Sequence, residues 1–312
     1  MSGISELRSV ASTRTAAKAA RGANRDNRTA YLFMLPWFIG LGLITIGPML
    51  ASLYLAFTDY NLLQAPSFTG LANLRRMVGD ASLQHSLAVT LRYVGISVPL
   101  QLIVALGLAL VLDKGVRGLA FYRSGFYLPS LLGSSVAVAI LWKQVFGAEG
   151  VVNAVLGFLG LPTESWTANP KTALWTLILL NAWTFGSPMV IFLAGLRQIP
   201  ASYYEAAKVD GAGRVGRLVH ITLPLLTPII FFNLVLQIIN AFQSFTQAYV
   251  ISSGTGGPVD STLFYTLYLY MQGFGNFNMG YASAMAWLLL LIVGGFTAIN
   301  FWAARFWVHY DD

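Results

Sequence analysis

Polar side chains recur at helical spacing within one long apolar stretch, residues 221–251. They are separated by four, three, four and three residues, which at 100° per residue places them within an arc of about 80° on a helix. Amides and hydroxyls are costly against lipid, so this stripe must face another helix or an aqueous path. Its members are Asn233, Gln237, Asn240, Ser244 and Gln247.

Neutral amides inside a membrane protein do one of two things. They link helices through hydrogen bonds worth about 1 kcal/mol or less, or they bind the hydroxyl groups of a solute such as a sugar. We favour the lining of a solute pathway, and helix-to-helix hydrogen bonding stays the alternative. The preceding apolar stretch adds Asn181 and Trp183, where an indole ring either stacks on a sugar or packs in the core, and Gly186 with Pro188 favours a break in that helix.

A second candidate site is the loop before this stripe, residues 199–224. Ser202 and Glu205 have the spacing of a capping box, and Pro200 prevents the helix from extending backwards. Gly211 or Gly213 supplies a C-terminal stop. The pattern predicts a short helix whose small alanines allow another surface to approach closely. Docking to a partner and a plain connector between spans are the two interpretations.

The chain lacks the residues required for disulfides, thiol catalysis, metal binding or nucleotide binding. The chain has no cysteine, which excludes disulfides and thiol nucleophiles. His85, His220 and His309 are far apart and lack acidic neighbours, so no metal site is predicted. Residues 211–216 match G-x-G-x-x-G without the strand that a dinucleotide site requires, and no phosphate-binding P-loop occurs. We expect no catalytic residues, which disfavours a membrane-embedded enzyme.

The composition indicates that apolar, membrane-spanning helices position these candidate residues. Hydrophobic residues make up 56% of the 312 residues and charged residues only 10%, against about 25% charged in soluble domains. Six uncharged runs are long enough to cross about 30 Å of hydrocarbon, and residues 262–272 are expected to form a further helix near the membrane surface. The predicted spans are Tyr31–Phe57, Val94–Leu112, Ser124–Trp142, Ala173–Leu196, Ile221–Ile251 and Tyr281–Ala304.

The basic residues set the orientation. Of the 19 Lys and Arg residues, fourteen lie on one side if the N-terminus is inside, which places both termini in the cytoplasm by the positive-inside rule. The net charge of +7 is thus explained without nucleic acid. Residues 1–30 are predicted to be a disordered basic tail, residues 31–304 a membrane domain, and residues 305–312 a cytoplasmic C-terminal tail.

The loop also carries a family resemblance. Glu205, Ala206 and Ala207, then Gly211, then the run from Ile221 to Pro224 resemble the EAA loop of ABC importer permeases. The resemblance covers about residues 31–304 and is nearest to carbohydrate-uptake permeases related to the larger membrane subunit of the maltose transporter, in their shorter six-span form. Supporting stretches lie at residues 57–60, 68–74, 128–129 and 256–258.

The resemblance implies roles for individual residues. Glu205 would contact a cytoplasmic ATPase, Ala206 and Ala207 would pack in its cleft, Gly211 would allow the turn, and Asp210 would cap or pair locally. Sugar contacts in the maltose subunit fall on a region that corresponds here to Asn240, Gln243 and Ser244.

Composition and spacing predict an all-α, polytopic membrane protein with six spans and a short helix between spans four and five. The resemblance implies that the protein lies in the inner membrane and that this helix is a coupling helix. The resemblance implies a second permease subunit, two ATPase subunits and an external substrate-binding protein as partners. This chain would bind no cofactor, since ATP and magnesium would sit in the ATPase. A secondary sugar carrier, and an ABC permease for glycerol phosphate or a polyol, are the alternatives.

Overall fold

The computed structural model describes residues 30–114, 118–133 and 135–309. Residues 1–29 of the predicted tail 1–30 and the last three residues of the predicted C-terminal tail lie outside this range. Within it the chain is mostly helical, and its strands β1 (Thr58–Asp59) and β2 (Ser67–Phe68) form one short antiparallel hairpin. The all-α class expected for a membrane permease is confirmed.

Long apolar helices and shorter linking helices alternate along the chain. π-helical or 3₁₀ turns occur at η1 (Leu41–Ile46), η2 (Leu218–Thr222), η3 (Pro258–Asp260) and η4 (Met271–Gly275). The α-helices are α2 (Gly47–Leu55), α3 (Ala72–Gly79), α4 (Ala81–Asp113), α5 (Leu119–Leu132), α6 (Val136–Val145), α7 (Val151–Phe158), α8 (Ala173–Trp183), α9 (Gly186–Leu196), α10 (Ala201–Val209), α11 (Arg214–Arg217), α12 (Leu223–Phe242), α13 (Thr246–Ile251), α14 (Tyr265–Tyr270) and α15 (Met279–Trp307).

Each predicted span corresponds to an apolar helix or a bent pair of helices. Four helical segments are long and apolar enough to cross a membrane: Ala30–Leu55, Ala81–Asp113, Arg214–Ile251 and Met279–Trp307. The third is interrupted at Gln243–Phe245, between α12 and α13, so the stripe predicted on one helix is divided there. The other two predicted spans are bent pairs, α5 with α6 at 97° and α8 with α9 at 41°. The bend after Trp183 agrees with the break predicted from Gly186 and Pro188.

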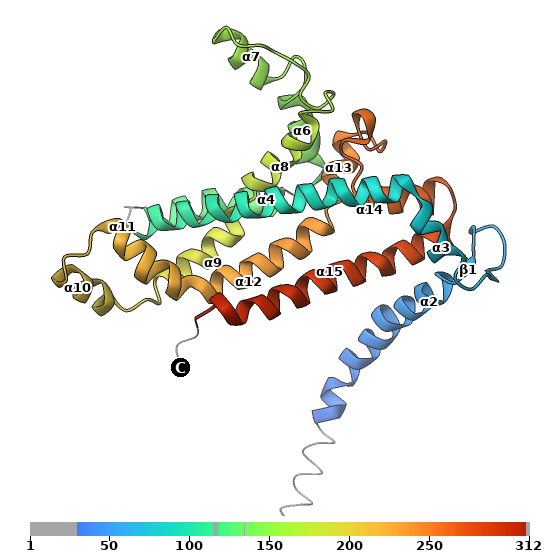
Figure 1. The fold of residues 1–312 in the computed structure, drawn as a ribbon, viewed down its shortest axis with the longest axis horizontal. Helices are drawn as coiled ribbons and strands as arrows, with labels where there is room; N and C mark the ends of the chain where they lie inside the picture. Colours follow the sequence, from blue (N-terminus) through green and yellow to red (C-terminus); the bar gives the residue numbers. More distant parts are fainter. Residues whose placement is uncertain (1–29, 115–117, 134, 310–312) are drawn as a thin grey trace, which may run out of the picture.

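Helix α4 is the centre of the bundle. It packs against α8, α9, α12 and α14, while α15 lies along α12 and α5 lies against α9 (Figure 1). The core between these helices is filled by large side chains that are almost completely buried, such as Leu177, Ile178, Met189 and Phe192. Burial on this scale fixes the relative positions of α4, α8 and α9.

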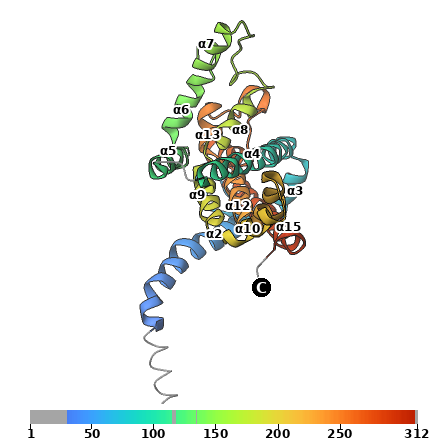
Figure 2. The ribbon, with the colours of Figure 1, turned by 90° about the vertical axis from the view of Figure 1, so that its left-hand side faces the viewer.

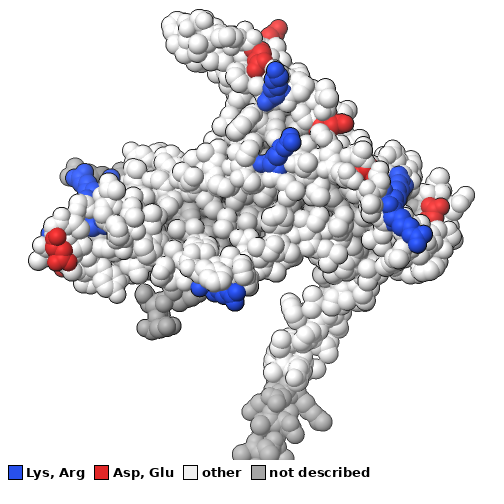
Figure 3. Space-filling model, viewed as in Figure 1, with Lys and Arg blue, Asp and Glu red and all other residues white. Residues whose placement is uncertain are grey.

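Two parts of the chain project from the bundle. The helix Ala30–Leu55 contacts α15 through its C-terminal part, α2, and the rest of it stands away from the bundle, with none of its most apolar window buried within the chain (Figures 1 and 2). Helices α6 and α7 extend in another direction (Figure 2). Charged side chains gather at the ends of the long helices and on this second projection, whereas the surface between is almost uncharged (Figure 3). That surface suits contact with lipid or with other apolar helices.

The segment expected to lie near the membrane surface, residues 262–272, is instead packed into the core. Tyr265 and Leu267 of α14 are fully buried. The Tyr265 amide donates to Thr90 Oγ1 of α4 at 2.9 Å, and its hydroxyl donates to the Met285 carbonyl of α15 at 2.8 Å. The expectation rests on tyrosines as amphipathic anchors at the membrane surface. It fails here because a tyrosine whose hydroxyl finds an acceptor can be buried.

Candidate functional site: a polar cavity and an exposed loop helix

A cavity of about 520 Å³ opens between α4, α5, α8, α9 and the junction of α12 with α13. Most of the side chains that line it are uncharged and polar, and none of them carries a full charge at neutral pH. The lining residues are Tyr93, Gln101, Ser130, Gly133, Leu177, Leu180, Asn181, Thr184, Ser187, Pro188, Gln237, Asn240, Gln243, Ser244, Phe245, Thr246 and Gln247.

Three interrupted helices meet at this cavity. Helix α5 ends just before Gly133, α8 ends just before Thr184, and α12 gives way to non-helical residues Gln243–Phe245 before α13 begins. Residues from all three interruptions line the cavity. A helix end leaves backbone carbonyls without a helical partner, and in a membrane such backbone is tolerated where it lines a cavity or is buried in protein. Substrate sites in transporters are commonly built from discontinuous helices for this reason.

Side chains from neighbouring segments satisfy the carbonyls at the three interruptions. Gln101 Nε2 and Ser130 Oγ donate to the Thr184 carbonyl at 3.0 and 2.8 Å. Gln247 Nε2 donates to the Gly133 carbonyl at 3.0 Å, and Thr266 Oγ1 donates to the Ser244 carbonyl.

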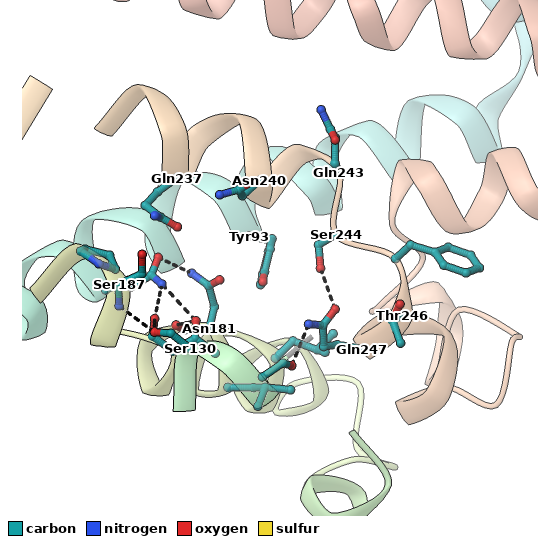
Figure 4. Close-up of a pocket in the computed structure, with 17 residues that line it drawn as sticks. Tyr93, Ser130, Asn181, Ser187, Gln237, Asn240, Gln243, Ser244, Thr246 and Gln247 are labelled. Atoms are coloured by element: carbon teal, nitrogen blue, oxygen red, sulfur yellow. Dashed lines mark hydrogen bonds between the residues drawn. The ribbon is translucent and has the colours of Figure 1, made fainter. Parts of the chain in front are cut away.

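Asn181 and Ser187 join the same network. Asn181 Nδ2 donates to Gln101 Oε1 at 3.3 Å, and the Ser187 amide donates to Ser130 Oγ at 2.8 Å (Figure 4). These bonds run between α4, α5, α8 and α9, so the polar groups of this wall are already engaged within the chain.

Three amides on the other side of the cavity differ from these residues in their hydrogen bonding. Gln237, Asn240 and Gln243 make no side-chain hydrogen bond to any described residue, and Asn240 and Gln243 are exposed. Gln243 is turned away from the other labelled side chains (Figure 4), and it also borders an apolar groove along α15. These amides are therefore available to a ligand.

The cavity brings together six of the eight residues predicted for a substrate pathway: Asn181, Gln237, Asn240, Gln243, Ser244 and Gln247. Asn233 is elsewhere, fully buried, with Nδ2 donating to the Ile229 carbonyl one turn earlier at 3.1 Å. Trp183 also does not line the cavity, and its ring lies 5.9 Å from that of Trp142.

Several polar lining residues were not predicted. Gln101 is the single amide in the apolar run 94–112, and an isolated amide in a span is a signal that could have identified it. Ser130 and Ser187 carry no such signal, because serine is common in membrane helices and their roles depend on the interruption at Thr184.

The predicted loop helix is present as α10, and Glu205, Ala206, Asp210 and Gly211 are exposed. Its C-terminal stop is confirmed at Gly211, which has φ of +77°. The Ala212 amide donates to the Ala207 carbonyl at 2.8 Å and the Gly211 amide to the Lys208 carbonyl at 3.1 Å, the two bonds of a Schellman motif.

The capping box is wrong. Pro200 is the N-cap residue, α10 begins at Ala201, and Ser202 is already inside the first turn without a capping bond. Proline can occupy this boundary because the first amides of a helix need no helical acceptor.

Two contacts connect the loop to the spans. Tyr204 Oη lies 3.0 Å from Thr222 Oγ1, which ties α10 to the start of the fifth predicted span. At the end of α9, Arg197 Nε lies 3.9 Å from Asp113 Oδ1 of α4. Asp210 forms no ion pair with the residues described here. A side-chain contact therefore links α10 to η2, the turn that immediately precedes α12.

Comparison with known proteins places this arrangement in a family. Residues 86–306 match the family model described as binding-protein-dependent transport system inner membrane component. The chain is 54% identical over 299 residues to the probable ABC transporter permease protein YesP of Bacillus subtilis, covering 95% of this chain and 97% of that one. It is 33% identical over 281 residues to the lactose transport system permease protein LacF of Rhizobium radiobacter, covering 88% and 93%.

The fold has a counterpart among solved structures. A chain of the crystal structure of the bacterial alginate ABC transporter, in complex with its alginate pentasaccharide-bound periplasmic protein, superposes with a TM-score of 0.76 at 20% identity, covering 90% of this chain and 95% of that one. The resemblance drawn from the EAA loop is confirmed. The chain belongs to the binding-protein-dependent transport system inner membrane components, the multi-pass permease subunits of ABC importers.

Proposed function

We propose that this permease carries a carbohydrate, and that its sugar contacts lie in the polar cavity. The observation that supports this most directly is the set of three unengaged amides, Gln237, Asn240 and Gln243, at the meeting point of three interrupted helices. Neutral amides both donate and accept hydrogen bonds, as sugar hydroxyls require. The lining offers no cation to a phosphate group, which favours a sugar or polyol over a glycerol phosphate. Relatives named for lactose and arabinooligosaccharides agree with a sugar.

The remaining predicted pathway residues have two other roles in this proposal. Asn181, Ser244 and Gln247 hold the interrupted helices in place while bordering the path. Asn233 and Trp183 would lie beside the path, Asn233 bonded to the Ile229 carbonyl of its own helix and Trp183 packed against Trp142. The hydrogen bonds of the first group and the positions of the second outside the cavity support this division.

Coupling to ATP hydrolysis would occur at α10. Glu205 would make polar contact with a cytoplasmic ATPase, Ala206 and Ala207 would pack in its cleft, and Asp210 and Gly211 would shape the turn that follows. The exposure of α10 and the contact between Tyr204 and Thr222 support this role. Closure of the ATPase would then move α12 and the amides that it carries.

The complete transporter would contain this chain, a second homologous permease, two ATPase subunits and an external sugar-binding protein. The chain would cross the membrane six times through residues 31–304, with both termini and α10 in the cytoplasm and the hairpin β1–β2 outside. It would catalyse no covalent chemistry, and ATP with magnesium would bind only to the ATPase subunits. Alternating access would expose the cavity first outside and then inside.

Reconstitution of the complex in proteoliposomes tests this function. Uptake of labelled sugar should require the binding protein on one side and ATP with the ATPase subunits on the other. Omission of the ATPase should abolish accumulation. Accumulation of sugar driven by an ion gradient without the ATPase would instead favour a secondary carrier.

A further inference from the structure

Four aromatic rings form a continuous series that begins at the polar cavity. Phe245 lines the cavity, and its ring centroid lies 5.4 Å from that of Tyr249 and 5.2 Å from that of Tyr270. Tyr249 and Tyr270 are 5.6 Å apart, and Phe274 stacks on Tyr270 at 5.2 Å. We call Phe245, Tyr249, Tyr270 and Phe274 the aromatic track.

The track joins segments that are distant in sequence. Tyr249 lies on α13, Tyr270 ends α14 and Phe274 lies in η4. The bond from Thr266 of α14 to the Ser244 carbonyl attaches α14 beside Phe245. The far end of the track is therefore at η4, on the side of the bundle that carries the β1–β2 hairpin (Figure 1). In the proposed orientation, this is the outer side.

The rings are more exposed than core packing requires. Tyr249 and Tyr270 are 38% and 37% exposed and Phe274 is 54% exposed, whereas the neighbouring Phe264 and Tyr265 are fully buried. The hydroxyls of Tyr249 and Tyr270 make no hydrogen bond to a described residue. Exposed aromatic residues in a membrane protein can also serve as anchors in the headgroup region. Anchoring alone does not explain why these rings contact one another and lead into a polar cavity.

We propose that the aromatic track is a second carbohydrate-binding site, which receives the sugar rings of an oligosaccharide beyond the unit held in the polar cavity. The electron-rich face of an aromatic ring attracts the partly positive C–H groups of a sugar face, and the free tyrosine hydroxyls can bond to sugar hydroxyls. The track continues directly from the amide-lined cavity, so one chain could contact both. This inference rests on the proposed function.

This geometry predicts that the effect of removing a ring on sugar uptake depends on the length of the oligosaccharide. A disaccharide held by the amides would reach Phe245 but hardly Tyr270 and Phe274, whereas a tetrasaccharide or pentasaccharide would extend along the whole track. Removal of the Tyr270 or Phe274 ring should therefore lower uptake of the longer sugar by about fivefold and leave uptake of the disaccharide nearly unchanged. Tyr270→Phe, which keeps the ring, should retain most of the uptake.

The test uses the complete complex with its binding protein in proteoliposomes. The wild type is first offered lactose and galactotetraose, cellobiose and cellotetraose, and the disaccharide and pentasaccharide of alginate. The series that it transports is then given to Tyr270→Ala, Phe274→Ala and Tyr270→Phe. Phe232→Ala is the matched control, because Phe232 on α12 is 52% exposed and lies outside the track.

The outcomes are distinct. Selective loss of the longer sugar in the two alanine variants, with unchanged thermal unfolding of the complex, supports the track. Equal loss at both lengths, a loss matched by Phe232→Ala, or no loss at all overturns it. A wild-type complex that transports no sugar of any series contradicts the proposed function itself, and this inference with it.

Discussion

Hydrogen bonding divides the polar residues around the cavity into two groups. Gln101, Ser130 and Gln247 are committed to backbone carbonyls at helix interruptions, while Asn240 and Gln243 have no partner among the described side chains and backbone groups. A polar group already bonded within the protein must give up that bond before it can bind a ligand. The two groups should therefore respond differently to substitution, the first in stability and the second in sugar affinity.

Replacement of the free amides should weaken sugar binding. Asn240→Leu or Gln243→Leu removes hydrogen bonds worth about 1 kcal/mol, so the sugar concentration for half-maximal uptake should rise about fivefold. Uptake kinetics in proteoliposomes provide the measurement. Asn300→Leu is the control, because Asn300 of α15 bonds, among the described residues, to the Phe296 carbonyl alone and lies outside the cavity. Unchanged kinetics in both variants would remove these residues from the pathway.

Replacement of a committed amide should instead lower stability. Gln247→Leu leaves the carbonyl of buried Gly133 without its side-chain donor, and the loss of its partner costs a buried polar group about 1–3 kcal/mol. Thermal unfolding of the detergent-solubilised complex should shift to lower temperature. The half-saturating sugar concentration of the remaining folded complex should stay near that of the wild type, and a large change there without destabilisation would assign Gln247 to sugar binding.

A carboxylate at the start of α4 predicts a dependence on pH. Asp80 Oδ1 accepts from the Leu83 amide at 3.0 Å, and Oδ2 accepts from Tyr268 and Tyr281 at 2.8 and 2.6 Å. Partial burial alone would raise the pKa of Asp80, but the hydrogen bond from Tyr281 and those from Leu83, Tyr268 and Ser82 together outweigh it and lower the pKa.

A lowered pKa means that the folded state favours the ionised carboxylate. Its contribution to stability is present above the ordinary pKa of about 3.9 and is lost as the pH falls through the lowered value. In Asp80→Asn, which keeps an N-cap side chain, this contribution is absent. The difference in unfolding temperature between wild type and variant should therefore be largest at neutral pH and shrink below about pH 4. A difference that is constant with pH would contradict the assignment.

The ends of α10 and the breaks in the helices beside the cavity bear on the proposed coupling. Gly211 ends α10 in the left-handed conformation that a Schellman motif needs, and Tyr204 links the helix to Thr222. The bend at Thr184 and the break at Ser244 interrupt helices beside the cavity. An exposed helix tied to the start of the fifth predicted span fits the proposed coupling role.

Disruption of α10 should uncouple transport from ATP hydrolysis. Gly211→Pro is incompatible with a φ of +77°, because proline fixes φ near −65°, and Glu205→Lys reverses a charge on the exposed face. Both variants should lose more than nine-tenths of uptake, while the permease is still inserted in the membrane. Ser202→Ala is the control and should be nearly neutral, because Ser202 makes no capping bond. Normal uptake in both disruptive variants would exclude the coupling role.

The whole molecule is a bundle with large unpartnered surfaces. The helix Ala30–Leu55 has none of its most apolar window buried within the chain, and charged residues gather at the ends of the long helices (Figure 3). Both properties are those of a subunit that is completed by lipid and by other helices.

The absence of cysteine from the sequence makes the orientation directly measurable. Lys171→Cys, between α7 and α8, should react with a membrane-impermeant maleimide on intact cells. Lys208→Cys on α10 should react only after the membrane is permeabilised. Both positions are exposed, so the reagent can reach them from its own side. The reverse pattern would invert the proposed topology.

The sequence by itself determined the class of the protein and a stop for the loop helix at Gly211 or Gly213. Scarcity of charge required a membrane environment, the EAA spacing pointed to the family, and a glycine can end a helix because backbone conformation there is local. The polar stripe from Asn233 to Gln247 was visible because helical periodicity depends only on spacing.

Only the tertiary structure decided which polar residues are free. Asn233 shares the stripe with Asn240, yet α12 packs so that one is buried and the other borders the cavity. Gln101, Ser130 and Thr184 come together from three helices, and the aromatic track from three further segments. Contacts of this kind depend on how helices cross and where they bend, and these depend on side-chain packing across the whole bundle.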